Sequence, residues 1–323
     1  MQLSASPFKV DQKITDVLGA KEFTLSAEIL PPRNGASQAA VLEQVKRLLE
    51  SGAEFLSVTK GAGGSLRGGS LPIAQVIKES FRVPSIAHFT CRDLTQEEVE
   101  NSLIDHHFFG IRNILALRGD PPDGVSEWIP KSNGHRFAYQ LIEQIKKLNE
   151  GVYLQRAGFD SSSSEKRERT DFCIGAATYP EHPDESERAE FFRLKVQAGA
   201  EYGISDMLFD PEIYARHLEE LAKVGVSVPI LPGTRILKSK SQALRMMNKF
   251  KVTVPKDLLE RLPEEDLNGD GFKNGLEGLL SITERLKQYG APGIHLFVIV
   301  DIQGAESALR ELNRVFMPGW RNR

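Results

Sequence analysis

The sequence predicts an α/β protein whose 323 residues form a single (β/α)8 TIM-type barrel. Eight short apolar segments alternate with longer amphipathic ones, and several apolar segments are near-continuous runs such as ILAL and VPIL. Strands that are buried on both faces of a parallel sheet have this composition. An open, doubly wound sheet is the alternative. No predicted strand is followed by the G-x-G-x-x-G turn of dinucleotide-binding sheets, which favours the closed barrel.

The eight predicted strands follow one another at intervals that leave room for a helix between them. They are Phe23–Leu30, Phe55–Thr59, Ser85–Thr90, Asn113–Leu117, Phe172–Ala177, Gly203–Phe209, Val228–Leu231 and Gly293–Val300. Helical spacing of apolar residues and capping residues at the starts predict the intervening helices. These are Gln38–Glu50, Pro72–Ser80, Thr95–Phe108, Arg136–Leu148, Glu187–Ala198, Pro211–Val224, Lys240–Phe250 with further helix before the last strand, and Ala305–Val315.

Three segments depart from this alternation. Residues 1–20 are predicted to be an N-terminal extension, and residues 151–171, serine-rich from Arg156 to Asp171, a polar surface loop. Leu262–Gly275 formally fits a calcium-loop pattern. Lys273 and Pro263 fit that pattern poorly, so an acidic connection with helix-capping residues is preferred, and no metal is expected.

The composition excludes several classes of protein. The formal net charge is −3 without a large basic block, which argues against nucleic acid as the main partner. No apolar run has the roughly 20 residues of a membrane-spanning helix, and the N-terminus lacks the apolar core of a secretory signal. Two cysteines, Cys91 and Cys173, cannot form a disulfide framework. We therefore expect a cytoplasmic protein with reduced thiols.

The carboxyl ends of the strands are where barrels of this kind collect their chemistry. Glu28 lies within an apolar strand, between Ala27 and Ile29, so burial should raise its pKa toward neutrality and suit it to general acid catalysis. The alternative is a structural glutamate that pairs with Arg33 or Arg118.

The end of the fourth strand carries a second carboxylate, Asp120, after Arg118 and Gly119. Glycine lets the backbone approach a ligand closely, so Asp120 is predicted to face a flat cofactor ring. The alternative is a turn or helix cap.

Two further strand-end residues allow several interpretations. His88 could be a base, a metal ligand or a core histidine, and we favour hydrogen bonding to a ligand. Lys60 could form a Schiff base, as in barrel aldolases, but a solvated lysine beside glycines is preferred. His106 and His107 lie on a predicted helix and are expected at the surface or in packing.

Five motifs at strand ends, AEILPPR, SVTKGA, AHFTC, ALRGDPP and YPEHP, resemble the methylenetetrahydrofolate reductase family in identity and order. The resemblance runs from the first strand to about the seventh. It implies a barrel with FAD that reduces 5,10-methylenetetrahydrofolate to 5-methyltetrahydrofolate in one-carbon metabolism and methionine biosynthesis. The usual electron donor is NADH or NADPH, and family members are often homo-oligomers.

The resemblance also implies roles for individual residues. Glu28 matches the general acid that protonates N10 of the folate, after which hydride passes from reduced flavin to the methylene carbon. Asp120 matches an aspartate beside both flavin and pterin. The flavin-contacting positions correspond to Thr59, His88, Arg118, Gly119, Asp120, Tyr179, His182 and Lys195, and the substrate-contacting positions to Glu28, Asp120 and Asp206.

The chain departs from the family pattern in its second half. Asp206 stands where the family has a glutamine, and Arg188 and Phe191 fall near places that usually offer polar contacts to the cofactor. The loop after the seventh strand lacks the family's stacking aromatic, and the eighth strand reads Val298–Asp301 instead of Thr-Leu-Asn. The alternatives are therefore a related pterin- or flavin-binding barrel with another C1 carrier or a protein electron donor, and a non-catalytic subunit of an electron-transfer complex.

Overall fold

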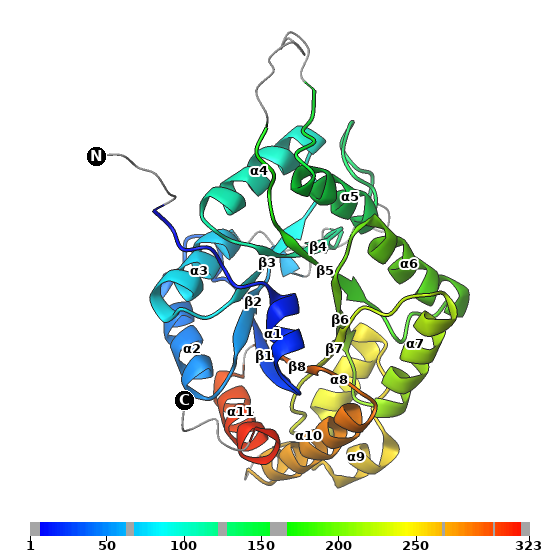
Figure 1. The fold of residues 1–323 in the computed structure, drawn as a ribbon. Coiled ribbons are helices and arrows are strands. Elements are labelled where there is room, and N and C mark those ends of the chain that lie inside the picture. The colour runs from blue at the N-terminus through cyan, green and yellow to red at the C-terminus, as the bar shows by residue number, and fades with distance from the viewer. Residues whose placement is uncertain are drawn as a thin grey trace.

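The computed structural model describes residues 7–62, 68–121, 128–155, 167–266, 269–299 and 301–317. Eight parallel strands pair in sequence order, and β8 pairs with β1 to close the barrel (Figure 1). The strands are β1 Thr24–Ile29, β2 Phe55–Val58, β3 Ser85–Thr90, β4 Asn113–Leu117, β5 Cys173–Thr178, β6 Tyr202–Met207, β7 Ile230–Thr234 and β8 Gly293–Phe297. The predicted fold class is confirmed.

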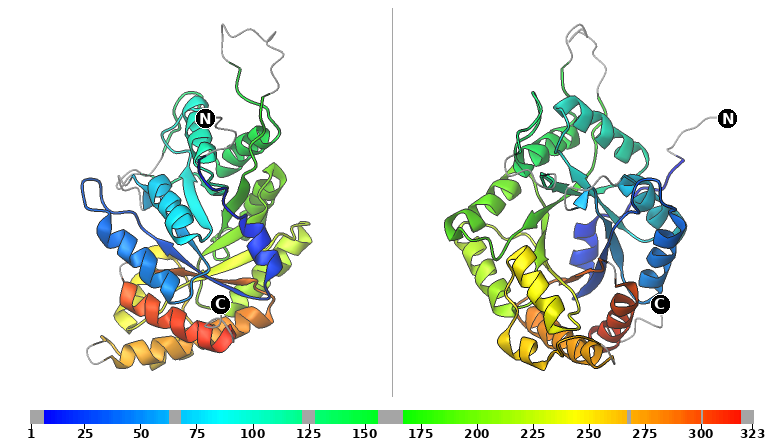
Figure 2. Two further views of the ribbon diagram at one scale, coloured as in Figure 1. Left: turned by 60° about the vertical axis from the view of Figure 1, so that its left-hand side comes forward. Right: turned by 180° about the vertical axis from the view of Figure 1, so that it is seen from behind.

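Helices surround the barrel on all sides, as the two further views show (Figure 2). They are α2 Ala39–Glu50, α3 Ser70–Val76 continued by the π-helix Ile77–Phe81, α4 Gln96–Phe108, α5 Ala138–Asn149, α6 Glu185–Ala198, α7 Pro211–Lys223, α8 Lys240–Phe250, α9 Lys256–Arg261, α10 Asp270–Gln288 and α11 Ile302–Phe316. Each predicted helix is present, and predicted caps act as such: Thr95 forms a capping box with Glu98, and Asp210 accepts from the Glu212 amide. Within the described residues, none of the helices combines the length and the apolar character needed to cross a membrane.

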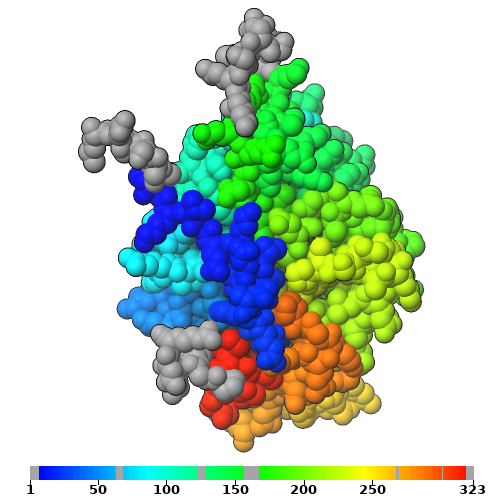
Figure 3. Space-filling view, viewed as in Figure 1, coloured from blue at the N-terminus to red at the C-terminus, as the bar shows by residue number. Residues whose placement is uncertain are grey.

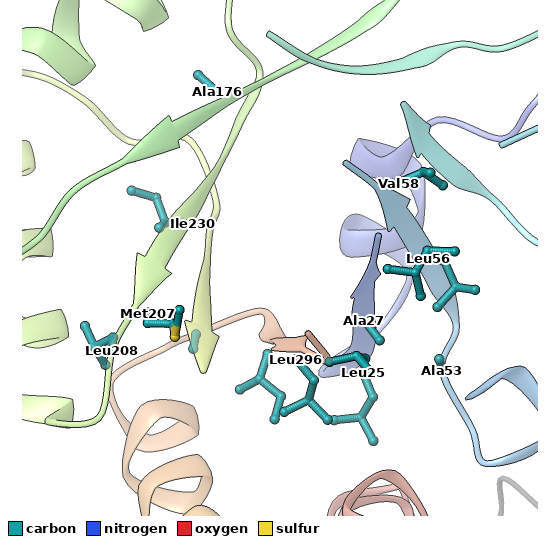
Figure 4. Close-up of a cluster of buried hydrophobic side chains, with 14 of the residues drawn as sticks. Leu25, Ala27, Ala53, Leu56, Val58, Ala176, Met207, Leu208, Ile230 and Leu296 are labelled. Carbon is teal, nitrogen blue, oxygen red and sulfur yellow. The ribbon is translucent and has the colours of Figure 1, made fainter. Parts of the chain in front are cut away.

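The outward faces of the strands carry the apolar side chains that pack against the helices. Figure 4 shows part of this shell, with Leu25 and Ala27 on β1, Leu56 and Val58 on β2, and Leu296 on β8. Side chains alternate across a strand, so the residues between them face the barrel interior. The interior positions of β1 and β2 therefore include Ser26, Glu28, Phe55 and Ser57.

A short helix that the sequence did not predict closes the amino-terminal end of the barrel. This helix, α1 Ile14–Ala20, crosses the middle of the barrel in Figure 1 and covers the centre of that face in Figure 3. Its buried residues Ile14, Val17 and Leu18 pack against inward-facing side chains of six strands: Phe55, Ile86, Leu115, Cys173, Tyr202, Ile204 and Leu231. The segment predicted as an extension is thus, from residue 14 to 20, part of the core.

The other two irregular segments fall partly outside the described residues. The polar loop is described only at residues 151–155 and 167–171; residues 156–166 lie outside. Near Leu262–Gly275, Asp266 accepts a hydrogen bond from the Gly271 amide at 3.1 Å, next to the start of α10, and Asn268 lies outside the described residues. No cluster of three or more acidic, histidine or cysteine side chains suited to a metal occurs in the described part of the chain. Cys91 and Cys173 are free and buried.

Candidate active site

A cavity of about 500 Å³ opens at the carboxyl ends of β1 to β5 and extends between the loops that lead to α5 and α6. Nine of the ten residues predicted for the site line it: Glu28, Thr59, His88, Arg118, Gly119, Asp120, Tyr179, His182 and Lys195. They come from five strand ends and one helix, because a closed parallel barrel brings all carboxyl ends of its strands to one rim.

Glu28 is the inward-facing carboxyl at the first strand end. Its side chain is 15% exposed, and burial raises its pKa from 4.5 to about 8. Glu28 pairs with His88, whose Nε2 lies 3.6 Å from Glu28 Oε2. The sequence alternative had been a pair with Arg33 or Arg118. Glu28 is therefore protonated at neutral pH, as a general acid must be before it acts.

His88 and Thr59 present polar atoms to the cavity that the protein itself does not satisfy. Among the described residues, neither His88 Nε2 nor Thr59 Oγ1 has a hydrogen-bond partner, although both atoms are buried. Burial lowers the pKa of His88 to about 3, so its imidazole is neutral. Because buried polar groups normally have partners, these two atoms are available to hydrogen-bond a bound molecule.

Another histidine, His295, lies inside the barrel near His88 and was not singled out by the sequence analysis. His295 on β8 is fully buried, with Nδ1 2.8 Å from Ser26 Oγ and Nε2 2.9 Å from Ser57 Oγ. Its pKa is lowered to about 3 by burial and by the neighbouring His88. His295 could have been found from the sequence, because a polar histidine within the predicted apolar strand Gly293–Val300 is unusual.

The turn after β4 brings its backbone close to the cavity. Gly119 has φ +94°, and a Cβ at this position would lie 2.9 Å from Arg92 Cβ, so glycine is required there. The Arg92 guanidinium donates to the carbonyl oxygen of Asp120, which holds the turn in place.

Lys195 lines the cavity from α6, and Tyr179, the residue that follows β5, lines it as well. Lys195 Nζ donates to the Ala177 carbonyl at 2.8 Å and lies 5.2 Å from the centre of the Tyr179 ring. Burial and the nearby Arg118 lower the pKa of Lys195 to about 8. Two like charges that face one cavity destabilise each other, and a bound anion would relieve this repulsion.

Aromatic side chains at the start of α5 and on α6 also line the cavity. Phe137 and Tyr139, at the start of α5, stack with ring centres 5.5 Å apart and an interplanar angle of 11°. Phe191 on α6 meets the ring of His182 edge-on at 6.3 Å. Arg188 does not join them: it donates to the His182 carbonyl and pairs with Glu220 at 3.2 Å, so it supports the segment that carries His182.

Three other sequence interpretations have a clear outcome. Lys60 is half-buried and lines the cavity, its Nζ lies 4.5 Å above the Phe89 ring, and burial lowers its pKa, so its side chain is only partly solvated. His106 is buried and bonds to the Ser102 carbonyl, as expected for packing. Asp206 lies on β6 and is not one of the cavity-lining residues; burial and Glu181 raise its pKa to about 7.

The fold and the cavity together define a class: a (β/α)8 barrel with a protonated carboxyl and unsatisfied polar atoms at the rim, in a cavity with aromatic and cationic walls. The chain belongs to the methylenetetrahydrofolate reductase family, whose sequence model matches residues 13–312.

Similar proteins include enzymes from plants and bacteria. Methylenetetrahydrofolate reductase (NADH) 1 of Arabidopsis thaliana is 27% identical over 305 residues, which are 90% of this chain and 48% of that protein. The 5,10-methylenetetrahydrofolate reductase of Salmonella typhimurium is 28% identical over 301 residues, 92% of this chain and 91% of that protein. The chain thus spans about half the length of the plant relatives and most of the bacterial one.

Two solved structures share the fold. One is a Clostridium thermocellum protein described as uncharacterized and as binding two copies of 5-methyl-5,6,7,8-tetrahydrofolic acid. It has a TM-score of 0.56 at 14% identity and covers 93% of this chain and 98% of its own. The other is oxaloacetate acetylhydrolase, with a TM-score of 0.51 at 15% identity over 97% of this chain and 88% of its own. Identities this low show a common architecture only.

Proposed function

We propose that residues 1–323 form a single catalytic domain that reduces 5,10-methylenetetrahydrofolate to 5-methyltetrahydrofolate with FAD as cofactor. The observation that carries the proposal is the buried carboxyl of Glu28, which lines a cavity of about 500 Å³ and lies 3.6 Å from His88 Nε2. An acid that keeps its proton at neutral pH can protonate N10 of the substrate, which opens the five-membered ring to an N5 iminium. The family membership of the chain supports the same reaction.

The residues of the cavity fit FAD in kind. Thr59 and His88 offer unsatisfied polar atoms near Glu28, suited to the polar edge of a flavin ring. Arg118 and Lys195 supply two positive charges, suited to a diphosphate. Phe137, Tyr139 and Phe191 supply aromatic faces, suited to an adenine ring.

The roles of the protein side chains follow from these positions. Bound FAD would supply the hydride, while Glu28 supplies the proton to N10. Asp120 places negative charge by the flavin and the pterin, which favours the cationic iminium over its neutral precursor. Asp206, on the β6 side of the barrel, would accept hydrogen bonds from the amino group and ring N–H of the pterin. Tyr179, His182 and Gly119 complete the cofactor contacts.

An absorption spectrum of the purified protein, before and after addition of FAD, tests the cofactor. Anaerobic titration with NADH, NADPH or a reduced ferredoxin-type protein should then bleach the flavin with one donor, and methylenetetrahydrofolate should restore its colour. A protein that stays colourless and inactive with added FAD would contradict the flavin assignment. Reoxidation by other C1 carriers, but not by methylenetetrahydrofolate, would contradict the substrate.

A further inference from the structure

The turn that follows β5 brings two aromatic rings to the cavity. Residues 179–182 form this turn, in which the His182 amide donates to the Tyr179 carbonyl at 3.1 Å. Both side chains line the cavity and contact α6: the Tyr179 ring centre lies 5.2 Å from Lys195 Nζ, and the His182 ring lies 6.3 Å from the Phe191 ring. The position of the turn therefore determines where these two rings stand in the cavity.

Arg188, in the first turn of α6, holds the far end of this turn. Its Nε and Nη2 atoms both donate to the His182 carbonyl, at 3.2 and 3.0 Å. The planar guanidinium allows both bonds at once. The Arg188 side chain is only 8% exposed and is not one of the described residues that line the cavity. Arg188 therefore acts on a bound molecule through the turn and not by contact.

Helix α7 holds the same segment from the other side. Glu220 accepts from Arg188 Nη1 at 3.2 and 3.4 Å, so the buried cation has an anionic partner. One helical turn earlier, His217 Nε2 lies 2.7 Å from Oγ1 of Thr178, the last residue of β5, and both of these side chains are buried. Helix α7 thus fixes the chain just before the turn directly and at His182 through Arg188.

We propose that Arg188 is a positioning residue for the cofactor: together with Glu220 it fixes the His182 carbonyl, and so keeps the rings of Tyr179 and His182 where they contact bound FAD. The effect on FAD rests on the proposed function, whereas the fixing of the turn does not.

The first test measures the turn without a ligand. The chain has seven histidines, so protein that is isotope-labelled in histidine alone gives seven backbone amide signals, and the signal that His182→Gln removes belongs to His182. In Arg188→Met, hydrogen exchange of the His182 amide should be at least about tenfold faster than in the wild type, because its bond to the Tyr179 carbonyl opens more often. Unchanged exchange would overturn the inference.

The second test measures FAD binding by flavin fluorescence. Arg188→Met should weaken binding about tenfold, which corresponds to the loss of one charge-assisted hydrogen bond. Arg188→Lys should recover part of this loss, because an ammonium group can bond to the carbonyl but lacks the fork that also holds Glu220. At saturating FAD, the rate of flavin reoxidation by methylenetetrahydrofolate and its pH profile should equal those of the wild type, because Glu28 and His88 are untouched.

Arg112→Met is the matched control for the loss of a buried arginine. The Arg112 side chain is also 8% exposed, donates to the His107 carbonyl at 3.0 Å and pairs with Asp171, but it directly precedes β4, at the end of the barrel away from the cavity. Arg112→Met should therefore cost stability without a change in FAD affinity or in exchange of the His182 amide. Equal effects of Arg112→Met and Arg188→Met on FAD affinity would overturn the positioning role.

Glu220→Ala tests whether Glu220 acts through Arg188. It should weaken FAD binding less than Arg188→Met does, and adding it to Arg188→Met should cause no further loss. Additive losses would overturn this part of the arrangement. If Arg188→Met does not fold, Arg188→Lys takes its place, with smaller changes in the same direction; unchanged exchange and unchanged affinity in Arg188→Lys would then overturn the inference.

The outcomes distinguish this inference from the proposed function. A wild type that binds no FAD contradicts the proposed function, and exchange of the His182 amide still decides whether Arg188 holds the turn. A wild type that binds FAD, with the same affinity in Arg188→Met, overturns the role of Arg188 toward the cofactor and leaves the proposed function in place.

Discussion

Replacing Glu28 by glutamine should make the protein more stable at neutral pH while it abolishes folate reduction. Burial raises the pKa of Glu28 from 4.5 to about 8. Between these values the folded protein keeps a proton that the unfolded chain releases, so the free energy of unfolding falls as the pH rises. The slope is about 1.4 kcal/mol per pH unit, which gives a cost of about 3.4 kcal/mol at pH 7.

The glutamine side chain does not ionise, so Glu28→Gln avoids this cost. Its amide is still a buried polar group near His88, and the cost of burying it reduces the gain in stability. We expect the variant to be about 2–3 kcal/mol more stable than the wild type at pH 7. This difference should shrink by about 1.4 kcal/mol per pH unit toward pH 4.5, where only the unfavourable contribution of the buried amide remains, and it should be constant above pH 8. Reduction of the flavin by its donor should continue, because it needs no proton from Glu28.

Urea unfolding of both proteins at pH 5, 6, 7 and 8 measures the difference. Glu100→Gln is the matched control: Glu100 is also buried, but it accepts a hydrogen bond from the Leu154 amide at 2.8 Å, so its replacement should give no gain. A stability difference between wild type and Glu28→Gln that is the same at pH 5 and pH 8 would refute the argument that Glu28 is held protonated. Equal loss of both half-reactions in Glu28→Gln would refute its role as the acid.

Three further predictions address the cofactor and the substrate. Lys195→Met should weaken FAD binding about tenfold, measured by flavin fluorescence, because a cation facing the diphosphate is lost; unchanged affinity would remove Lys195 from the cofactor site. Gly119→Ala should lose about 1–3 kcal/mol of stability and most FAD affinity. Gly225 also has a positive φ of +77°, but nothing lies within 4 Å of a Cβ placed there, so Gly225→Ala measures the cost of backbone strain alone. If Gly119→Ala and Gly225→Ala change FAD binding equally, the close contact at Gly119 has no role in binding. The KM for folate should fall as the pH rises through about 7 and Asp206 ionises, and Asp206→Asn should make it independent of pH in this range; parallel profiles would exclude Asp206 as a pterin contact.

The fold could be predicted from the sequence because strands buried on both faces are the most distinctive segments of a chain. The predicted and observed starts of the first four strands agree within one residue, since turns and polar residues flank each apolar run. Helix α1 could not be predicted with the same rules. It has only seven residues, and Ile14, Val17 and Leu18 gain their burial from six strands that lie far along the chain.

The candidate site was predictable where its residues follow strand ends, because barrel closure gathers those ends without knowledge of side-chain packing. His295 was not predictable in this way. Its two partners, Ser26 and Ser57, are 269 and 238 residues away in sequence, and only closure of β8 onto β1 brings them together. The support of His182 by Arg188 likewise depends on the packing of α6 against α7, through Glu220.

Helix α1, which could not be predicted from the sequence, affects the pKa of Glu28, which could be predicted as a site residue. Below Glu28 the barrel holds the polar layer of Ser26, Ser57 and His295, and below that an apolar layer that α1 closes with Ile14 and Val17. The described residues therefore leave Glu28 open to water on the cavity side, and a bound flavin would cover that side as well. A carboxyl desolvated from both directions keeps its proton at a pH where an exposed one would lose it. The closed amino-terminal end of the barrel is thus one physical cause of the raised pKa at its opposite end.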